Sequence, residues 1–117
     1  MINEIEEKRK YLDKAIEKLK ANGIDLAQKE KDYKIALNKK ALVLREEEMP
    51  VTLINQVIYG YEDIAELRYQ RDVAQTIYNT NLEYINSIKL QLRLLENQIS
   101  REWSNNWYTI GNKNNWI

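Results

Sequence analysis

One uninterrupted heptad pattern covers residues 62–103 and constrains the fold more than any other feature of the sequence. Apolar residues recur there in alternating steps of three and four, which is the period of a coiled coil, and neither Gly nor Pro interrupts them. At about 1.5 Å per residue such a helix is roughly 60 Å long, so it needs a partner of similar length to cover its apolar side. We call this side the seam, and it consists of Ile64, Leu67, Arg71, Ala74, Tyr78, Asn81, Ile85, Ile88, Leu92, Leu95 and Ile99.

The first half of the chain carries a poorer form of the same pattern, which predicts a second helical region. Charged residues of both signs cover the remainder of its surface. Its seven-residue repeat is formed by Ile5, Leu12, Leu19, Leu26 and Tyr33, with Ile16, Leu37 and Leu44 on an adjoining row.

The sequence around Gly23 predicts a break or kink within this region. Gly at this place can take the left-handed conformation that ends many helices. Asp25 with Gln28 three residues later has the spacing of an N-cap and its capping-box partner, which would start a new helix. The seven-residue spacing from Leu19 to Leu26 favours the alternative, an unbroken helix. We expect the break, and therefore a separate N-terminal helix.

A short apolar segment lies where the chain is expected to reverse. Pro50 disfavours helical conformation in the residue before it, which ends the preceding helix. Thr52 suits the N-cap of a short helix at 53–59 that ends at Gly60. This helix is either a plug that covers the end of the hairpin or a knob that binds a partner protein. Its candidate partner-binding residues are Leu53, Ile54, Ile58, Tyr59 and Tyr61.

Two polar seam positions and a second apolar row bear on self-association. Arg71 and Asn81 either fix register and oligomeric state or lie at the edge of the seam in contact with solvent. The second row widens the stripe beyond what one facing helix covers, which predicts a third packed helix or a homo-oligomer, with a dimer favoured. This row is Val73, Ile77, Tyr84, Leu90 and Leu94. The candidate oligomer seam is Arg71, Tyr78, Asn81, Ile85, Ile88, Leu92, Leu95 and Ile99.

Composition changes abruptly after Trp103. The segment 104–117 is rich in Asn and aromatic residues, and Gly111 with Asn112 suits a type II′ turn between two short strands. An isolated hairpin is marginal in water, so the segment is either docked on the helices or held for a partner. Trp and Tyr are favoured interface anchors, which adds Trp103, Trp107, Tyr108 and Trp116 to the candidate partner-binding residues.

These patterns together predict an all-α fold. The expected architecture is a long antiparallel helical hairpin, coiled-coil-like, with helices at about 25–48 and 62–103. A short apolar helix lies at the turn, and an extra helix precedes the hairpin. We expect residues 1–103 to form one domain and 104–117 a C-terminal tail.

Composition favours protein binding over catalysis. Lys plus Arg and Asp plus Glu each number 18, so the formal charge is zero, whereas nucleic-acid binding needs a cationic surplus. Cys and His are absent, which removes thiolate nucleophiles and imidazole catalysis. Glu62, Asp63 and Glu66 cluster where the helix dipole favours acidic residues, so we assign them no metal. We expect no enzyme activity, no catalytic residue, no cofactor, no membrane span and a cytoplasmic location.

Three stretches of sequence resemble a group of short, uncharacterised helical proteins from the early regions of phages and prophages of low-GC Gram-positive bacteria. They are EMPVTLI at 48–54, AELRYQRD at 65–72, and INSIKLQLRLLE at 85–96 followed by REW at 101–103. The resemblance covers about two thirds of the chain, and none of these strings is a catalytic motif. It implies a phage setting and a helical hairpin, and transfers no functional site.

Small phage early proteins of this sort commonly bind and redirect a host protein. The resemblance therefore implies an inhibitor of a bacterial defence system, such as a CRISPR effector, that acts by protein–protein contact. One alternative is a coiled-coil accessory of phage replication or recombination. A further alternative is an oligomer that sequesters a signalling nucleotide through Arg and Tyr side chains.

Overall fold

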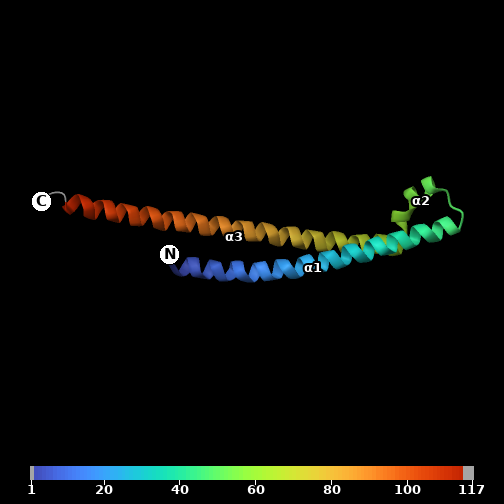
Figure 1. Cartoon of the computed structure of the whole chain (residues 1–117), viewed down its shortest axis with the longest axis horizontal. Helices are drawn as coiled ribbons and strands as arrows, with labels where there is room; N and C mark the ends of the chain where they lie inside the picture. Colours follow the sequence, from blue (N-terminus) through green and yellow to red (C-terminus); the bar gives the residue numbers. More distant parts are fainter. Residues whose placement is uncertain (1, 115–117) are drawn as a thin grey trace. The chain divides into compact units, whose positions relative to one another are not determined.

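Helices account for nearly all of the part of the chain that the structure describes. The structure is a computed structural model, which describes the backbone of residues 2–114 and the side chains of residues 3–105. It contains the α-helices α1 (Ile2–Glu46), α2 (Val51–Val57) and α3 (Glu62–Asn114), and a 3-10 helix, η1 (Ile58–Gly60) (Figure 1). No strand occurs within residues 2–114, so the predicted all-α fold class is confirmed.

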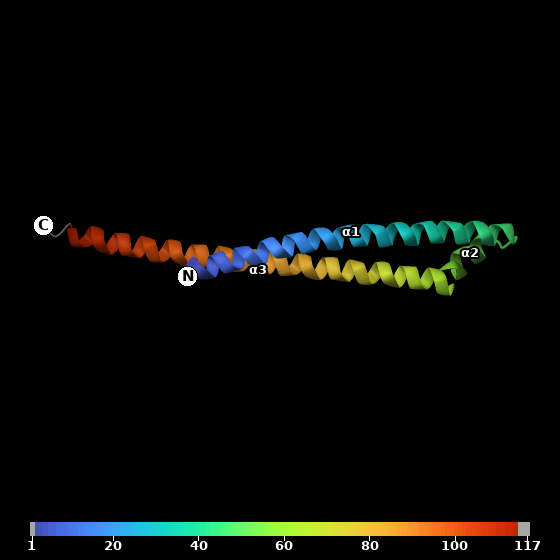
Figure 2. The ribbon, with the colours of Figure 1, turned by 90° about the horizontal axis from the view of Figure 1, so that it is seen from below.

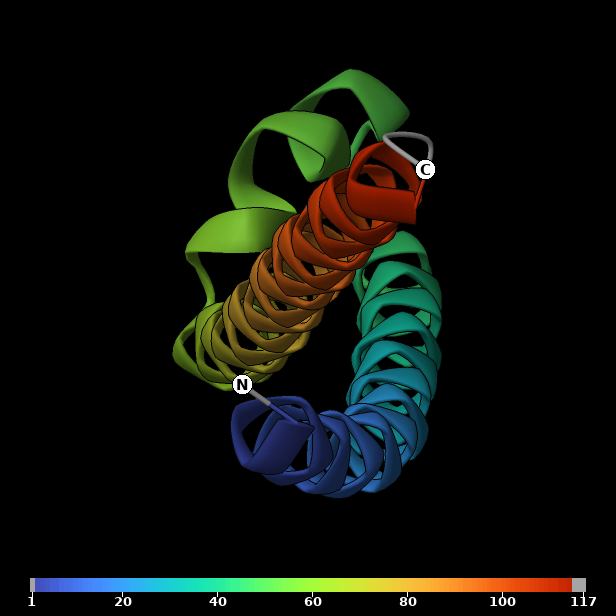
Figure 3. The same ribbon diagram turned by 90° about the vertical axis from the view of Figure 1, so that its left-hand side faces the viewer.

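The chain is a helical hairpin that divides into two compact units. One unit consists of Met1–Glu17 with Leu82–Ile117, and the other is Lys18–Asn81, which includes α2 and η1. In each unit a stretch of α1 and a stretch of α3 run antiparallel and side by side (Figure 2, Figure 3). The stretches of α3 that lie beside α1 therefore have their partner helix within the same chain, and the C-terminal end of α3 extends past the start of α1 (Figure 1).

The α3 seam faces inward in both units, as predicted. Ile64 is fully buried, and Ala74, Ile85, Ile88 and Leu92 are at most 7% exposed. Burying one large aliphatic side chain contributes about 1.5–3 kcal/mol, so these residues account for much of the packing. The residues proposed as an oligomer seam are thus used within the chain. The half-buried seam positions are Leu67, Arg71, Tyr78, Asn81, Leu95 and Ile99.

Helix α1 runs without interruption through Gly23, so the predicted break at 22–25 and the separate N-terminal helix are both wrong. Gly23 does not have a positive φ. A Cβ atom there would lie 3.3 Å from Cε2 of Tyr78, so the residue's small size serves close approach between α1 and α3. The expected capping residues instead make i,i+4 contacts inside the helix: Asp25 with Lys29, and Gln28 with Asp32.

The inward side of α1 follows the seven-residue repeat but not the whole adjoining row. Tyr33 and Leu44 are buried, and the earlier members of the repeat are half-buried. Ile16 is 46% exposed, whereas its neighbour Ala15 is 8% exposed. The inward position at this level therefore belongs to Ala15, and a small side chain there lets the two helices lie close together.

Helix α1 ends in a Schellman motif centred on Glu48. Glu48 has φ of 61° and donates its N–H to the carbonyl of Arg45 at 3.0 Å. The N–H of Met49 donates to the carbonyl of Leu44 at 3.1 Å, and the Met49 side chain packs against the core cluster that contains Leu44. These are the two hydrogen bonds and the hydrophobic contact of this helix ending, with Glu in place of the usual Gly.

Helix α2 begins at Val51, one residue after Pro50, rather than after Thr52. The Pro50 carbonyl accepts hydrogen bonds from the N–H groups of Leu53 and Ile54, both at 3.0 Å, and no side chain caps the helix. The predicted Thr52 N-cap is therefore wrong, because Pro50 already has the extended backbone that this position needs.

Helix α3 continues to Asn114, which makes the predicted β-turn at Gly111 and Asn112 wrong. Each residue added to an existing helix gains a hydrogen bond, whereas a two-stranded hairpin must nucleate separately and is marginal in water. The end of its expected second strand, at 115–117, lies outside the described residues.

The left-handed residue predicts a stabilising substitution. Glu48→Gly should raise the free energy of unfolding by about 1 kcal/mol, because Gly adopts positive φ without the steric cost that other residues have. Thermal unfolding followed by circular dichroism measures the effect. The matched control is Glu47→Gly, which should not stabilise, since Glu47 has no positive φ. Equal melting temperatures for Glu48→Gly and the unmodified protein would contradict the prediction.

Candidate functional site

One side of α2 and η1 is part of the hydrophobic core. Ile54 and Ile58 are each 4% exposed and pack with Leu44, which is 2% exposed. Half-buried residues surround them: Leu37, Ala41, Met49 and Tyr61. Two of the candidate partner-binding residues, Ile54 and Ile58, are therefore core residues, and the plug interpretation describes this side of the short helix.

The other side of the same segment is open to solvent. Val51 is 60% exposed, Leu53 41% and Tyr59 45%, although all three are apolar or aromatic. The guanidinium of Arg68, on α3, lies 5.2 Å from the centroid of the Tyr59 ring. We call Val51, Leu53, Tyr59 and Arg68 the α2 surface. Beside it lies a hollow of about 340 Å³ lined by Gln56, Val57, Gly60 and Tyr61.

The first turn of α3 is held to α1 by an exposed ion pair. The Nζ atom of Lys40 lies 3.1 Å from Oδ2 of Asp63 and 4.8 Å from the centroid of the Tyr61 ring. The hydrogen bond from Lys40 is the main reason why the pKa of Asp63 lies below its usual value. Asp63, one member of the acidic cluster, thus has a structural role at this junction.

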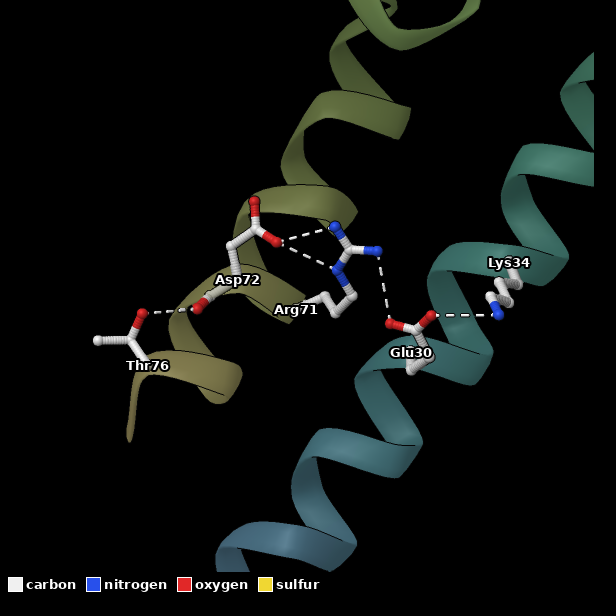
Figure 4. A network of polar contacts seen from close by, with 5 residues as sticks. All are labelled: Glu30, Lys34, Arg71, Asp72 and Thr76. Carbon is white, nitrogen blue, oxygen red and sulfur yellow. Dashed lines mark hydrogen bonds and ion pairs between the residues drawn. The ribbon is translucent and has the colours of Figure 1, made fainter. Parts of the chain in front are cut away.

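Arg71 is the charged residue of the seam, and it links the two helices of its unit (Figure 4). Its guanidinium lies 4.7 Å from the centroid of the buried Tyr33 ring. One nitrogen lies 3.5 Å from Oε2 of Glu30 on α1, and two others donate to Oδ1 of Asp72 at 2.8 and 3.1 Å. The side chain is 24% exposed. Arg71 therefore stacks on Tyr33 and also reaches solvent, and its contact with solvent agrees with the interpretation that it lies at the edge of the seam.

Two seam-facing amides in the Lys18–Asn81 unit lack hydrogen-bond partners. The Nδ2 atoms of Asn22 and Asn81 are buried, and no group within the described side chains accepts from them. A buried donor without a partner costs about 1–3 kcal/mol. Burial of the Asn81 Nδ2 atom argues against the interpretation that Asn81 lies at the edge of the seam in contact with solvent.

An exposed apolar row flanks the seam of α3. Tyr69 is 64% exposed, Val73 39% and Ile77 46%, and their spacing of four residues places them in line along the helix. We call these three residues the α3 flank. The flank is the outer wall of an open groove of about 360 Å³ in the Lys18–Asn81 unit, whose other lining residues are Asp25, Lys29, Gln70 and Ala74.

The remaining unit has polar contacts at its surface and further exposed apolar residues on α3. Lys8 donates to Oε1 of Gln91 at 2.7 Å, and Arg9 pairs with Glu96 at 3.2 Å. Both members of the second pair are more than half exposed, so the pair contributes little to stability. The predicted second apolar row remains uncovered in this unit at Tyr84, Leu90 and Leu94.

The aromatic anchors predicted near the C-terminus are only partly described. Trp103 is 73% exposed on α3. Trp107 and Tyr108 belong to the same helix, but their side chains lie outside the described residues. Trp116 lies outside them altogether. Trp103 is thus the member of this set with an observed position.

The comparisons with known proteins give no relative for this chain. It matches none of the family models, none of the curated proteins and none of the solved structures with which it was compared. Within the described residues, no helix is both long and apolar enough to cross a membrane. The same part of the chain contains no group of three or more His, Cys, Asp or Glu side chains that could hold a metal ion.

Sequence reasoning missed two features of these surfaces. Tyr69 was not among the candidate residues. It lies four residues before Val73 and eight before Ile77, and this spacing places it on the same line along a helix, which the sequence alone indicates. The contact between Gly23 and Tyr78 had no such signal, because it depends on which residues of the two helices come to the same level.

The Lys40–Asp63 pair predicts an acid-dependent contribution to stability. Because the folded-state pKa of Asp63 is lowered, its contribution is present above the unfolded-state value of about 3.9 and is lost as the pH falls through the folded-state pKa. Asp63→Asn should lower the melting temperature at pH 7 but not near pH 2. The control is Glu66→Gln, which replaces a carboxylate that accepts from Gln70 within the same helix. A melting difference for Asp63→Asn that persists at pH 2 would refute the assignment.

The stacking of Arg71 on Tyr33 predicts a measurable coupling energy. A double-mutant cycle with Arg71→Met and Tyr33→Leu, read by chemical denaturation, should give about 0.5–1.5 kcal/mol, because the ring is buried and the guanidinium mostly covered. The matched cycle uses Arg68→Met and Tyr59→Leu at the exposed stack and should give a smaller coupling. Equal coupling energies in the two cycles would show that burial of the ring does not strengthen the stack.

Proposed function

We propose that this protein is a non-enzymatic protein-binding module whose α2 surface docks on a partner protein. The observation that carries the proposal is the division of one short segment into a buried side and an exposed side. Ile54 and Ile58 anchor it in the core, while Leu53 and Tyr59, one residue away from each, are 41% and 45% exposed.

Support from the core makes the α2 surface suitable for binding. The exposed residues are carried by a backbone whose inner side chains are almost completely buried against Leu44. The start of α3 is tied to α1 beside them by Lys40 and Asp63. A surface held in one conformation loses little conformational entropy on binding, so more of its contact energy contributes to affinity.

The residue types of the α2 surface also suit a protein partner. Tyr and Arg are enriched among residues that dominate binding energy, and here Tyr59 and Arg68 already form a stacked pair. Val51 and Leu53 supply further exposed apolar area on the same short segment. A partner that covers the Tyr59 ring would desolvate the stack and strengthen it.

The partner we propose is a host defence protein, such as a CRISPR effector, and the protein would act as a phage-encoded inhibitor in the host cytoplasm. This part of the proposal is supported by the resemblance of the strings at 48–54, 65–72 and 85–96 to phage early-region proteins. The first of these strings contains Val51 and Leu53, and the second contains Arg68.

Plaque counts on a host that carries the defence system test the proposed inhibition. Cells that express the protein should give more plaques than cells that lack it. Tyr59→Ala should reduce the affinity of the protein for the defence protein about 30-fold, since truncating a central Tyr costs about 2 kcal/mol. Affinity is measured by biolayer interferometry with the full chain.

The matched control is Tyr84→Ala, because Tyr84 is 51% exposed but lies on the other unit. It should leave the affinity unchanged. Plaque counts that do not respond to the protein would contradict the inhibitor function. Recovery of a single-stranded-DNA-binding protein or a recombinase as the partner lost on Tyr59→Ala would instead assign the surface to phage replication or recombination.

A further inference from the structure

The α3 flank is a second apolar surface, separate from the α2 surface. Tyr69, Val73 and Ile77 form a straight ridge, one residue per helical turn, and all three are substantially exposed. The groove beside this ridge has the buried Ala74 among its lining residues and Asp25 and Lys29 of α1 on its other side. Neither α1 nor any other described segment covers it.

The shape of this surface fits another helix. Ridges of side chains spaced four residues apart pack into the grooves between such ridges on a facing helix. A small side chain such as Ala74 in the groove leaves room for an incoming side chain. A helix–helix contact is built from a ridge and a groove, and this molecule presents both on the same side of its Lys18–Asn81 unit.

The charges at the groove identify the kind of helix that fits. Asp25 and Lys29 lie one turn apart on α1, with Oδ1 and Nζ 3.9 Å apart. In an antiparallel interface whose two-fold axis crosses at the level between them, each of them meets the residue of opposite charge in the other copy. The surface is therefore complementary to itself.

Long-range electrostatics does not oppose such pairing. The formal net charge of the chain is zero, so two copies approach without net repulsion. Packing two helical pairs along their flanks gives a four-helix arrangement, in which the exposed apolar stripe of each pair is covered.

We propose that the α3 flank and its groove pair with the same surface of a second copy of this chain, with Asp25 of each copy opposite Lys29 of the other. The dimer interface then uses the α3 flank and not the heptad seam, which α1 already covers. The α2 surface takes no part in this pairing, so each dimer presents two α2 surfaces, one on each copy.

Sedimentation equilibrium of the full chain across a dilution series tests the proposal. The expected mass at high concentration is twice 14.0 kDa. Ile77→Asp should raise the dissociation constant of the dimer about 100-fold, since each copy would place an unpaired carboxylate in the apolar contact. The matched control is Ile16→Asp, because Ile16 and Ile77 are each 46% exposed. Circular dichroism verifies that both variants remain helical.

Charge reversal distinguishes pairing with a second copy from binding of another partner. Asp25→Lys alone and Lys29→Asp alone should each weaken the dimer, whereas a mixture of the two variants should restore it as a heterodimer. A chain that remains monomeric at all concentrations overturns the proposal. A dimer that Ile77→Asp leaves intact, or one that charge reversal does not affect, overturns the assigned surface.

Discussion

The contact of Leu44 with Ile54 and Ile58 is the interaction on which the arrangement of the Lys18–Asn81 unit depends. It brings the end of α1 against α2 and η1, and so sets the residue at which α3 can begin. From that point the level of each contact between α1 and α3 follows. Lys40 meets Asp63, then Tyr33 meets Arg71, and further along Gly23 meets Tyr78. A shift at the turn would misplace every later contact.

Polar residues inside the seam restrict this register further. A purely aliphatic seam tolerates a slip of one heptad at little cost, because one Leu or Ile replaces another. Arg71 has only one position at which both the Tyr33 ring and the Glu30 carboxylate are available. Gly23 similarly suits the level of Tyr78, since a Cβ at this position would lie 3.3 Å from Cε2 of the ring and the ring would have to shift. Register is thus specified by a few particular residues, while stability comes from the many aliphatic ones.

The sequence was sufficient to predict the fold class, the seam of α3 and the position of the turn, because each depends on periodicity or on the local effect of Pro50. It was insufficient at Gly23, where the same residue suits a helix ending and a close helix–helix contact. Only the partner helix distinguishes these, and Tyr78 lies 55 positions away in the chain. The buried and exposed sides of α2 could not be told apart from the sequence for a related reason. Leu53 and Ile54 are similarly apolar, and which of them is buried depends on where Leu44 packs. The function was harder to predict than the fold, since the residues of the α2 surface form no catalytic or metal-binding motif.

The separation of inner and outer residues within α2 and η1 has a consequence for how the protein can change over evolutionary time. Ile54 and Ile58 are confined to apolar residues of similar volume, because both are almost completely buried in the cluster that contains Leu44. Their neighbours Leu53 and Tyr59 are 41% and 45% exposed, and Tyr59 stacks with Arg68, so both are less restricted in volume than the core residues. If the α2 surface binds a partner as we propose, substitutions at the outer positions would redirect recognition while the hairpin stays folded. A lineage under pressure to follow a changing target could vary this surface one residue at a time.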